Sequence, residues 1–288
     1  MKEGEKGLRQ SEAFFQHIIN IPDLLDEIPT SILKKITSIG ISSQPRPLPN
    51  SYMPVFRAGE SFGKSFSHIL GCNYVQFSHQ EGHIEAAKWS LQKELTGPFI
   101  AVHLSGGTTE ILRVEEHHGN YQIFIVGGTS DISTGQFIDR VGVKLGFSFP
   151  CGKAMDNLII SGSQDIHLLP AAVDGAYMSF SGPETMAYRL IEKGYSPFEI
   201  ASSVFRCIAE SLIKSIAYVS KETGLNQILF LGGVSSSKFI REYLNEKASM
   251  HKLFFLWGNP KYCTDNAVGT ALLAGKKLYQ QSKSFSKI

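Results

Sequence analysis

The sequence has little cysteine. Four cysteines occur among 288 residues, at positions 72, 151, 207 and 263, and none forms a CxxC pair. This spacing argues against a zinc ribbon and against a disulfide framework, and it favours a reducing, cytoplasmic location. The sequence also lacks any run of 18 apolar residues, and its first ten residues, MKEGEKGLRQ, lack the apolar segment of a signal peptide. These absences predict a soluble protein with no membrane partner.

A strong excess of one charge is also missing. The formal net charge is +2, so composition alone neither demands nor excludes nucleic acid as a partner. With 42% hydrophobic and 19% charged residues, the chain has ordinary globular composition and ample material for a core. Its length fits one large domain or two ordinary ones.

The first hundred residues alternate between helical and strand patterns. A capped amphipathic helix is predicted over residues 11–28, with Pro22 as a candidate break. A buried strand over residues 36–43, a helix over residues 58–71, a strand over residues 73–77 and a helix over residues 79–95 are predicted to follow. This alternation predicts a mainly parallel α/β sheet. The next apolar strand breaks at SGGTT and resumes as a hairpin, which places a lobe boundary near His103.

The second half of the chain continues the alternation. One helix is predicted to end at Gly146, a helical stretch to follow over residues 183–221, and a strand, a glycine-rich turn and a helix to come next. The predicted organisation is a first lobe of residues 1–103, completed by the C-terminal helix within residues 264–288, and a second lobe of residues 104–263.

His79 and His83 lie four residues apart in HQEGH, and Ser78 is placed to cap a helix that begins there. Residues i and i+4 of a helix share one face, so the two imidazoles can bind a single ion, although hydrogen-bonded surface histidines would show the same spacing. A zincin protease requires glutamate directly after the first histidine, and here that residue is Gln80. Glu81 lies about 200° around the helix from His79, so it points away from such an ion.

Two glycine-rich turns follow strands, at LSGGTTE (residues 104–110) and LFLGGVSSSK (residues 229–238). Glycine lets backbone N–H groups approach a phosphate, and the second turn leads into a helix N-terminus that favours anions. Tight structural turns would look the same. Asp139 and Asp265 are further candidates: Asp265 suits either a helix N-cap or a third metal ligand beside two histidines.

The motifs HQEGH, SGGTTEIL, GQFIDRVGVKLGFSFPCG, MSFSGPET, LGGVSSSKFIRE and CTDNAVG occur in this order. As a set they resemble the TsaD (YgjD, Gcp or Kae-type) family, from about residue 36 to the C-terminus. The resemblance implies an α/β, two-lobed fold like that of actin, hexokinase and Hsp70 ATPases. It also implies transfer of a threonylcarbamoyl group from threonylcarbamoyl-adenylate to the adenosine next to the tRNA anticodon, with protein partners of a threonylcarbamoylation complex.

The resemblance also assigns roles to residues. One divalent ion per chain, iron or zinc, is expected on His79, His83 and Asp265. Contacts to threonylcarbamoyl-adenylate or an ATP-like nucleotide are expected from Leu104, Ser105, Gly106, Gly107, Thr108, Asp139, Gly152 and Ser237.

The chain departs from the family pattern at several positions. Thr108 replaces the histidine of SGGHT, Ser237 the asparagine of AGGVxAN, Glu184 the lysine of SFSGLKT and Gln136 the glutamate of GEAFDK. The opening LGIETS-like strand of the family is also missing, which predicts a first lobe without its opening strands: a late-assigned start, a fragment, or a sheet edge covered by a partner. Besides the transferase, the departures leave open a catalytically weak regulatory paralogue and, less favoured, a metallopeptidase.

Overall fold

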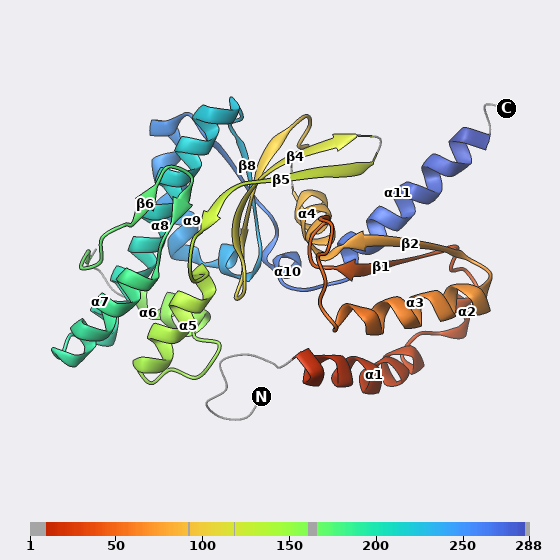
Figure 1. The fold of residues 1–288 in the computed structure, drawn as a ribbon, viewed down its shortest axis with the longest axis horizontal. Helices are drawn as coiled ribbons and strands as arrows, with labels where there is room; N and C mark the ends of the chain where they lie inside the picture. Colours follow the sequence, from red (N-terminus) through yellow and green to blue (C-terminus); the bar gives the residue numbers. More distant parts are fainter. Residues whose placement is uncertain (1–9, 92, 118, 161–165, 286–288) are drawn as a thin grey trace. The chain divides into compact units, whose positions relative to one another are not determined.

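The structure is a computed structural model that describes residues 10–91, 93–117, 119–160 and 166–285. The polar start discussed above, residues 1–9, lies outside the described residues. Two compact units emerge (Figure 1). The first contains the described residues up to Trp89, together with Gly119, Asn120 and those from Asp265 onward. The second contains those within Ser90–His117 and Tyr121–Thr264.

The first unit is built on a parallel strand pair. Strands β1 (Ser38–Gln44) and β2 (Asn73–Ser78) pair in register from Ser38↔Asn73 to Ser42↔Phe77, which agrees with the predicted parallel arrangement. Its helices are α1 (Gln10–Asp26), α2 (Thr30–Leu33), α3 (Phe56–Leu70), α4 (His79–Trp89) and α11 (Val268–Phe285).

Two helix predictions for this unit were wrong in detail. Helix α1 continues through Pro22, because a proline removes one hydrogen bond and bends a helix without necessarily ending it. Helix α4 ends at Trp89 rather than at residue 95. The two-lobe boundaries stay a prediction, although strand Phe99–Leu104 falls in the second unit.

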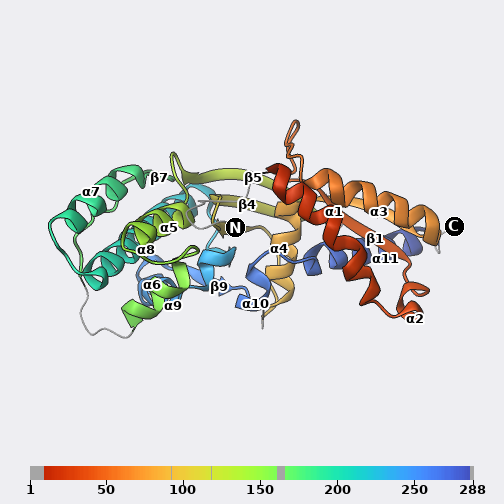
Figure 2. The same ribbon diagram turned by 90° about the horizontal axis from the view of Figure 1, so that it is seen from below.

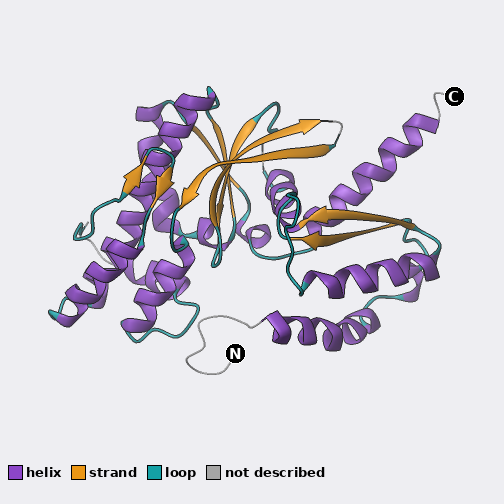
Figure 3. Ribbon diagram, viewed as in Figure 1, coloured by secondary structure: helices purple, strands orange, loops and turns teal. Residues whose placement is uncertain are grey.

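The second unit is built on a seven-stranded sheet in the order β6-β7-β5-β4-β3-β8-β9 (Figure 3). Strand β3 (Phe99–Leu104) pairs antiparallel with β4 (Thr109–His117) and parallel with β8 (Gln227–Leu231), and β8 pairs parallel with β9 (Phe254–Trp257). The remaining strands are β5 (Asn120–Thr129), β6 (Val173–Asp174) and β7 (Tyr177–Met178). The carboxyl ends of β3 and β8 therefore meet at one edge, where ligands bind in open α/β sheets.

Helices α5 (Thr134–Lys144), α6 (Gly152–Ile160), α7 (Ser181–Glu192), α8 (Pro197–Thr223), α9 (Lys238–Ala248) and the short α10 (Pro260–Cys263) complete the second unit. The single helical stretch predicted over residues 183–221 is wrong. Ser196 forms a capping box with Glu199, and Pro197 starts a new helix, α8.

The core of the second unit explains why α8 is so apolar. Strand β3 and helix α8 contribute to the same buried cluster. Its members include the alternate β3 residues Ile100, Val102 and Leu104 and the α8 residues Val204, Ile208 and Leu212. Each of these side chains is fully buried, so the sheet edge that carries the glycine turns rests on a rigid base. Within the described part of the chain, no helix combines the length and apolarity needed to cross a bilayer.

Candidate metal centre and glycine-turn site

Helix α4 starts directly at His79, and a capping box fixes that start. The Glu81 N–H donates to Ser78 Oγ (3.2 Å), while the Ser78 N–H and hydroxyl donate to Glu81 Oε2 at 2.6 and 2.7 Å. This is the reciprocal pattern of a serine N-cap and a glutamate three residues later. Glu81 is thereby committed to the backbone at the helix start, so it is not the general base of a zincin-type peptidase.

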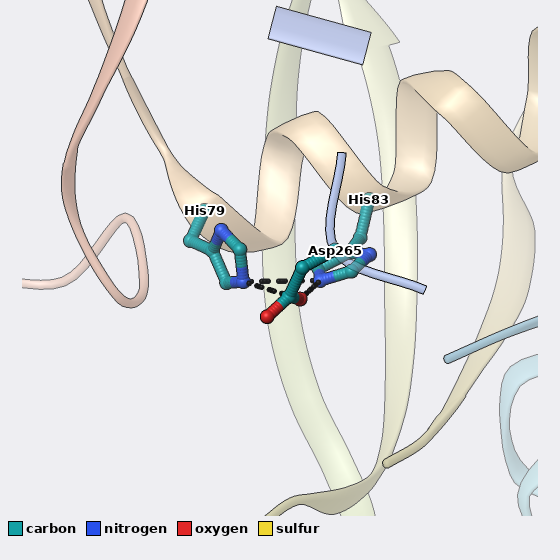
Figure 4. A group of neighbouring side chains, drawn as sticks. All are labelled: His79, His83 and Asp265. Atoms are coloured by element: carbon teal, nitrogen blue, oxygen red, sulfur yellow. Dashed lines mark hydrogen bonds and ion pairs between the residues drawn. The ribbon is translucent and has the colours of Figure 1, made fainter. Parts of the chain in front are cut away.

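His79, His83 and Asp265 lie together within the first unit (Figure 4). The two Nε2 atoms are 3.0 Å apart, and Asp265 Oδ1 lies 3.2 Å from His79 Nε2 and 3.0 Å from His83 Nε2. Figure 4 shows both rings directing these nitrogens toward the carboxylate. The structure thus brings together the three residues that the sequence suggested as ligands.

This geometry fits a metal ion. Donor atoms bound at about 2.0–2.2 Å with angles between octahedral and tetrahedral values lie about 2.8–3.6 Å apart. The three separations fall within that range. Two imidazoles and one carboxylate suit zinc or non-haem iron, both of which leave further coordination positions for water or substrate. His83 is buried while the Asp265 side chain is 83% exposed, so those positions are accessible from the side of Asp265.

Asp265 is available as a ligand because its neighbour caps the helix. Asn266 Oδ1 accepts a hydrogen bond from the Val268 N–H at the start of α11 (2.9 Å), so the N-cap alternative for Asp265 is wrong. Hydrogen bonds from His79 and His83 hold the pKa of Asp265 well below its usual range. The carboxylate is therefore charged at neutral pH, as a metal ligand requires.

Two glycines bring Asp265 to the histidines. A Cβ atom on Gly269 of α11 would lie 1.8 Å from the Gly82 carbonyl oxygen of α4, and one on Gly82 would lie 2.9 Å from Thr270 Oγ1. The two helices therefore cross with their backbones in contact, which only glycine permits. The Lys276 ammonium adds a second link, because it donates to the buried Glu85 carboxylate of α4 at 2.8 Å.

The first glycine turn of the second unit is a tight hairpin. The Ser105 N–H donates to the Thr108 carbonyl (2.8 Å), and the Thr108 N–H donates to Ser105 Oγ (3.0 Å). Gly106 and Gly107 are exposed at its tip, and a Cβ atom added to either residue would meet nothing within 4 Å. Gly135 of α5 abuts this tip, since a Cβ there would lie 2.5 Å from Gly106 Cα. The hairpin thus presents exposed glycine backbone beside a helix start.

The second glycine turn adjoins the first. Gly232 has φ +89°, and a Cβ there would lie 2.3 Å from the Leu104 carbonyl oxygen. The glycine pairs of the two turns, Gly106–Gly107 and Gly232–Gly233, are distant in sequence but meet because β3 and β8 are parallel neighbours. Arg241, which sequence reasoning missed, supports the second turn by donating to the Ser235 and Gly258 carbonyls at 2.6 and 3.0 Å.

Asp139 and Gly152 lie next to each other. Asp139 Oδ1 accepts a hydrogen bond from the Cys151 N–H (2.7 Å), which fixes the start of α6 at Gly152. Burial raises the pKa of Asp139, and it raises the pKa of the Cys151 thiol to about 11. A Cβ on Gly152 would meet only Ile138, at 3.9 Å, so its backbone is approachable.

Ser237 contacts a carboxylate that the sequence did not reveal. Its hydroxyl donates to Asp156 Oδ1 (2.8 Å) and accepts from the Ile240 N–H (3.2 Å). Asp156, from α6, also accepts the N–H groups of Lys238 and Phe239. The N-terminus of α9 thus already holds an anion from the protein itself. No sequence signal could have identified Asp156, because it is 81 residues from Ser237.

Two departures from the family pattern have internal partners. Gln136 completes a capping box with Ser133 at the start of α5, a role that glutamate would also fill. Glu184 lies 3.4 Å from the Arg140 guanidinium and accepts a hydrogen bond from the Tyr188 hydroxyl (2.7 Å). The reversed charge at Glu184 is therefore compensated within the fold.

The α/β fold is of the type found in actin, hexokinase and the Hsp70 ATPases, as the sequence predicted. A crystal structure of full-length HypF in a phosphate- and nucleotide-bound form superposes with a TM-score of 0.59 and 13% identity, over 80% of this chain and 38% of the HypF chain. At that identity the likeness concerns the fold alone.

The chain belongs to the TsaD family, described as tRNA N6-adenosine threonylcarbamoyltransferase, whose model matches residues 11–272. A protein of that name from Caldicellulosiruptor saccharolyticus is 29% identical over 79% of this chain and 69% of its own length. A probable bifunctional tRNA threonylcarbamoyladenosine biosynthesis protein from Methanothermobacter thermautotrophicus is 30% identical over 95% of this chain, which spans 49% of that relative. The predicted family is confirmed, and the binding roles of individual residues stay predictions.

Proposed function

We propose that this chain transfers a threonylcarbamoyl group from threonylcarbamoyl-adenylate to the N6 amine of the adenosine next to the tRNA anticodon. The observation that carries the proposal is the convergence of His79, His83 and Asp265 to within 3.2 Å of one another. Family membership supplies the reaction class. We further propose one iron or zinc ion on these three residues, a cytoplasmic location and partner proteins of a threonylcarbamoylation complex.

The reaction requires activation of an acyl adenylate. The N6 amine forms a bond to the carbamoyl carbon, the bond from that carbon to the phosphate oxygen breaks, AMP leaves with the electron pair, and one proton is released. When bound, the ion would supply a Lewis acid for the carbonyl or a clamp for the adenylate phosphate.

The chain's own residues would hold and orient the substrate. His79, His83 and the ionised Asp265 would hold the ion, and the exposed Asp265 side chain leaves their common side accessible to substrate. The exposed backbone of Gly106 and Gly107 suits contact with an anionic group, because a Cβ atom built on either glycine would meet nothing within 4 Å, so the side where a side chain would stand is open. Asp139 lies beside the start of α6 and would contact the nucleoside there. Leu104, Ser105, Thr108, Gly152 and Ser237 complete the proposed substrate contacts.

One observation favours a second candidate, a metal- and nucleotide-binding paralogue that is catalytically weak and acts as a regulatory subunit. The Ser237 hydroxyl is engaged by Asp156 and by the Ile240 N–H, so little of its hydrogen-bonding capacity remains for a nucleotide. An asparagine at this position would reach further.

The decisive experiment incubates the zinc- or iron-loaded protein with tRNA and threonylcarbamoyl-adenylate, with and without candidate partner proteins, and measures modified adenosine by mass spectrometry. His83→Ala tests the ligand set, and His68→Ala, an exposed histidine on α3, is the matched control. Bound metal is measured in parallel by elemental analysis.

Modification that is lost in His83→Ala and retained in His68→Ala supports the transferase. Metal and nucleotide binding without turnover under every condition supports the regulatory paralogue instead. Equal metal content in His83→Ala and the wild type would contradict the proposed ligand set, and metal-dependent peptide cleavage would revive the peptidase.

A further inference from the structure

Strand β5 has an edge that is largely unpaired. Its inner neighbour is β4, and along the described residues its outer neighbour β7 pairs with it only at Gly128 and Thr129. Among the residues that the structure describes, no strand pairs with residues 122–126 on the outer side. In Figure 2, β5 lies at the border of the sheet beyond β4. An edge of this kind is a template for another strand.

The hydrogen bonds to β7 show which backbone groups point outward. The N–H groups of Gly128 and Ser130 donate to the carbonyls of Ala176 and Met178 at 3.1 and 2.9 Å. Because strand residues alternate in direction, the N–H and C=O groups of Gln122, Phe124 and Val126 point to the same side. Three residues thus offer paired donors and acceptors along the open edge.

The side chains of the open segment itself do not oppose pairing, and the Arg113 guanidinium of β4 lies 6.0 Å from the centre of the Phe124 ring. Residues 121–127, YQIFIVG, contain no charged side chain and no proline, whereas natural proteins usually protect exposed edges with such residues. Phe124 is 50% exposed and Ile125 is 42% exposed, on opposite faces of the strand. Apolar surface is therefore accessible on both sides of the free edge.

We propose that β5 pairs antiparallel with β5 of a second copy of this chain, about a two-fold axis at Phe124. Phe124 then faces its own counterpart, Gln122 faces Val126, and Ile123 faces Ile125. This register gives about six backbone hydrogen bonds. In this register the three outward-pointing residues, Gln122, Phe124 and Val126, pair only with one another across the axis. Asn120, whose side chain contacts Lys277, takes no part.

The self-complementary order of side chains favours a second copy over an unrelated partner. Reading the segment in either direction from Phe124 places an aromatic residue on an aromatic one and an isoleucine on an isoleucine, pairs that stabilise antiparallel strands. The two-fold axis also closes the assembly as a dimer. Pairing along one short edge buries less than a standard interface, so we expect a dimer that dissociates on dilution.

Sedimentation velocity over a wide concentration range tests the proposal. The wild type should shift from monomer to dimer as concentration rises, and Phe124→Lys and Phe124→Glu should each remain monomeric, because like charges meet at the axis. An equimolar mixture of these two variants should recover the dimer. Circular dichroism verifies that both variants are folded, as expected for a half-exposed side chain.

A cross-link gives an independent measurement of the register. Facing residues of a hydrogen-bonded pair have Cα atoms about 5.5 Å apart, which suits a disulfide. Phe124→Cys should form a covalent dimer on mild oxidation, and Ile69→Cys, 79% exposed on α3, should not. A wild type that stays monomeric at all concentrations, a dimer that persists in Phe124→Lys, or equal cross-linking of the two cysteine variants would overturn the proposal.

Discussion

The crossing of α4 and α11 gives the sharpest test of how the metal centre is assembled. In Gly269→Ala the new methyl group would lie 1.8 Å from the Gly82 carbonyl oxygen and 2.8 Å from the Ala86 nitrogen. Both are backbone atoms, so no side-chain rotation relieves the overlap. Ordinary contact distances are about 3.5–4.0 Å, so the helices must separate by more than about 1.5 Å.

Such a separation acts on both stability and metal binding. Overpacking of this kind costs about 1–3 kcal/mol. Asp265 precedes Gly269 by four residues, so it moves with the start of α11. Metal–ligand distances in proteins stay within about 0.2 Å of their ordinary values. Mutation of a residue that supports a ligand lowers metal affinity about 10–100-fold, and we expect the zinc affinity of Gly269→Ala to fall by at least that factor.

The matched control is Gly275→Ala, in the same helix. Its new methyl group would meet nothing within 4 Å, and alanine is favoured over glycine within helices by about 1 kcal/mol. Urea unfolding followed by circular dichroism should show Gly275→Ala stabilised and Gly269→Ala destabilised, and competition with a zinc chelator should show weakened binding only in Gly269→Ala. If the two variants unfold at the same urea concentration with equal zinc affinity, the close-crossing explanation is refuted.

Three further predictions follow from single contacts. Ser78→Ala removes the cap that Glu81 reciprocates, and it should lower the free energy of unfolding by about 1 kcal/mol in urea titrations; an unchanged midpoint would contradict the capping role. Lys276→Met leaves the buried Glu85 without its ammonium partner and should cost about 1–2 kcal/mol, whereas unaltered thermal stability would show that the pair contributes nothing. Hydrogen bonds from two serine hydroxyls and two backbone N–H groups lower the pKa of Asp131. The ionised carboxylate therefore stabilises the folded state above the unfolded-state pKa of about 3.9. This contribution is lost as the pH falls toward the folded-state pKa. Asp131→Asn should therefore be less stable than the wild type at pH 7, with a gap that narrows in acid, and a gap constant with pH would contradict this.

The sequence by itself determined the local chemistry. The spacing of His79 and His83 requires only that one helix turn be formed, and Ser78 with Glu81 specifies where that turn begins. The same short-range logic gave the strands and glycine turns at SGGTT and LGGVSS and excluded Glu81 as a zincin base, because each depends on residues within a few positions of one another.

Only the tertiary structure decided which distant groups meet. Asp265 reaches the histidines because Gly269 and Gly82 let two helices touch, and Asp156 occupies the start of α9 beside Ser237 because α6 packs against that helix. Glu184 likewise finds Arg140 across a helix contact. The members of these pairs are separated by tens to nearly two hundred residues. Their proximity depends on how the helices pack, and a pattern of neighbouring residues in the sequence does not determine that packing.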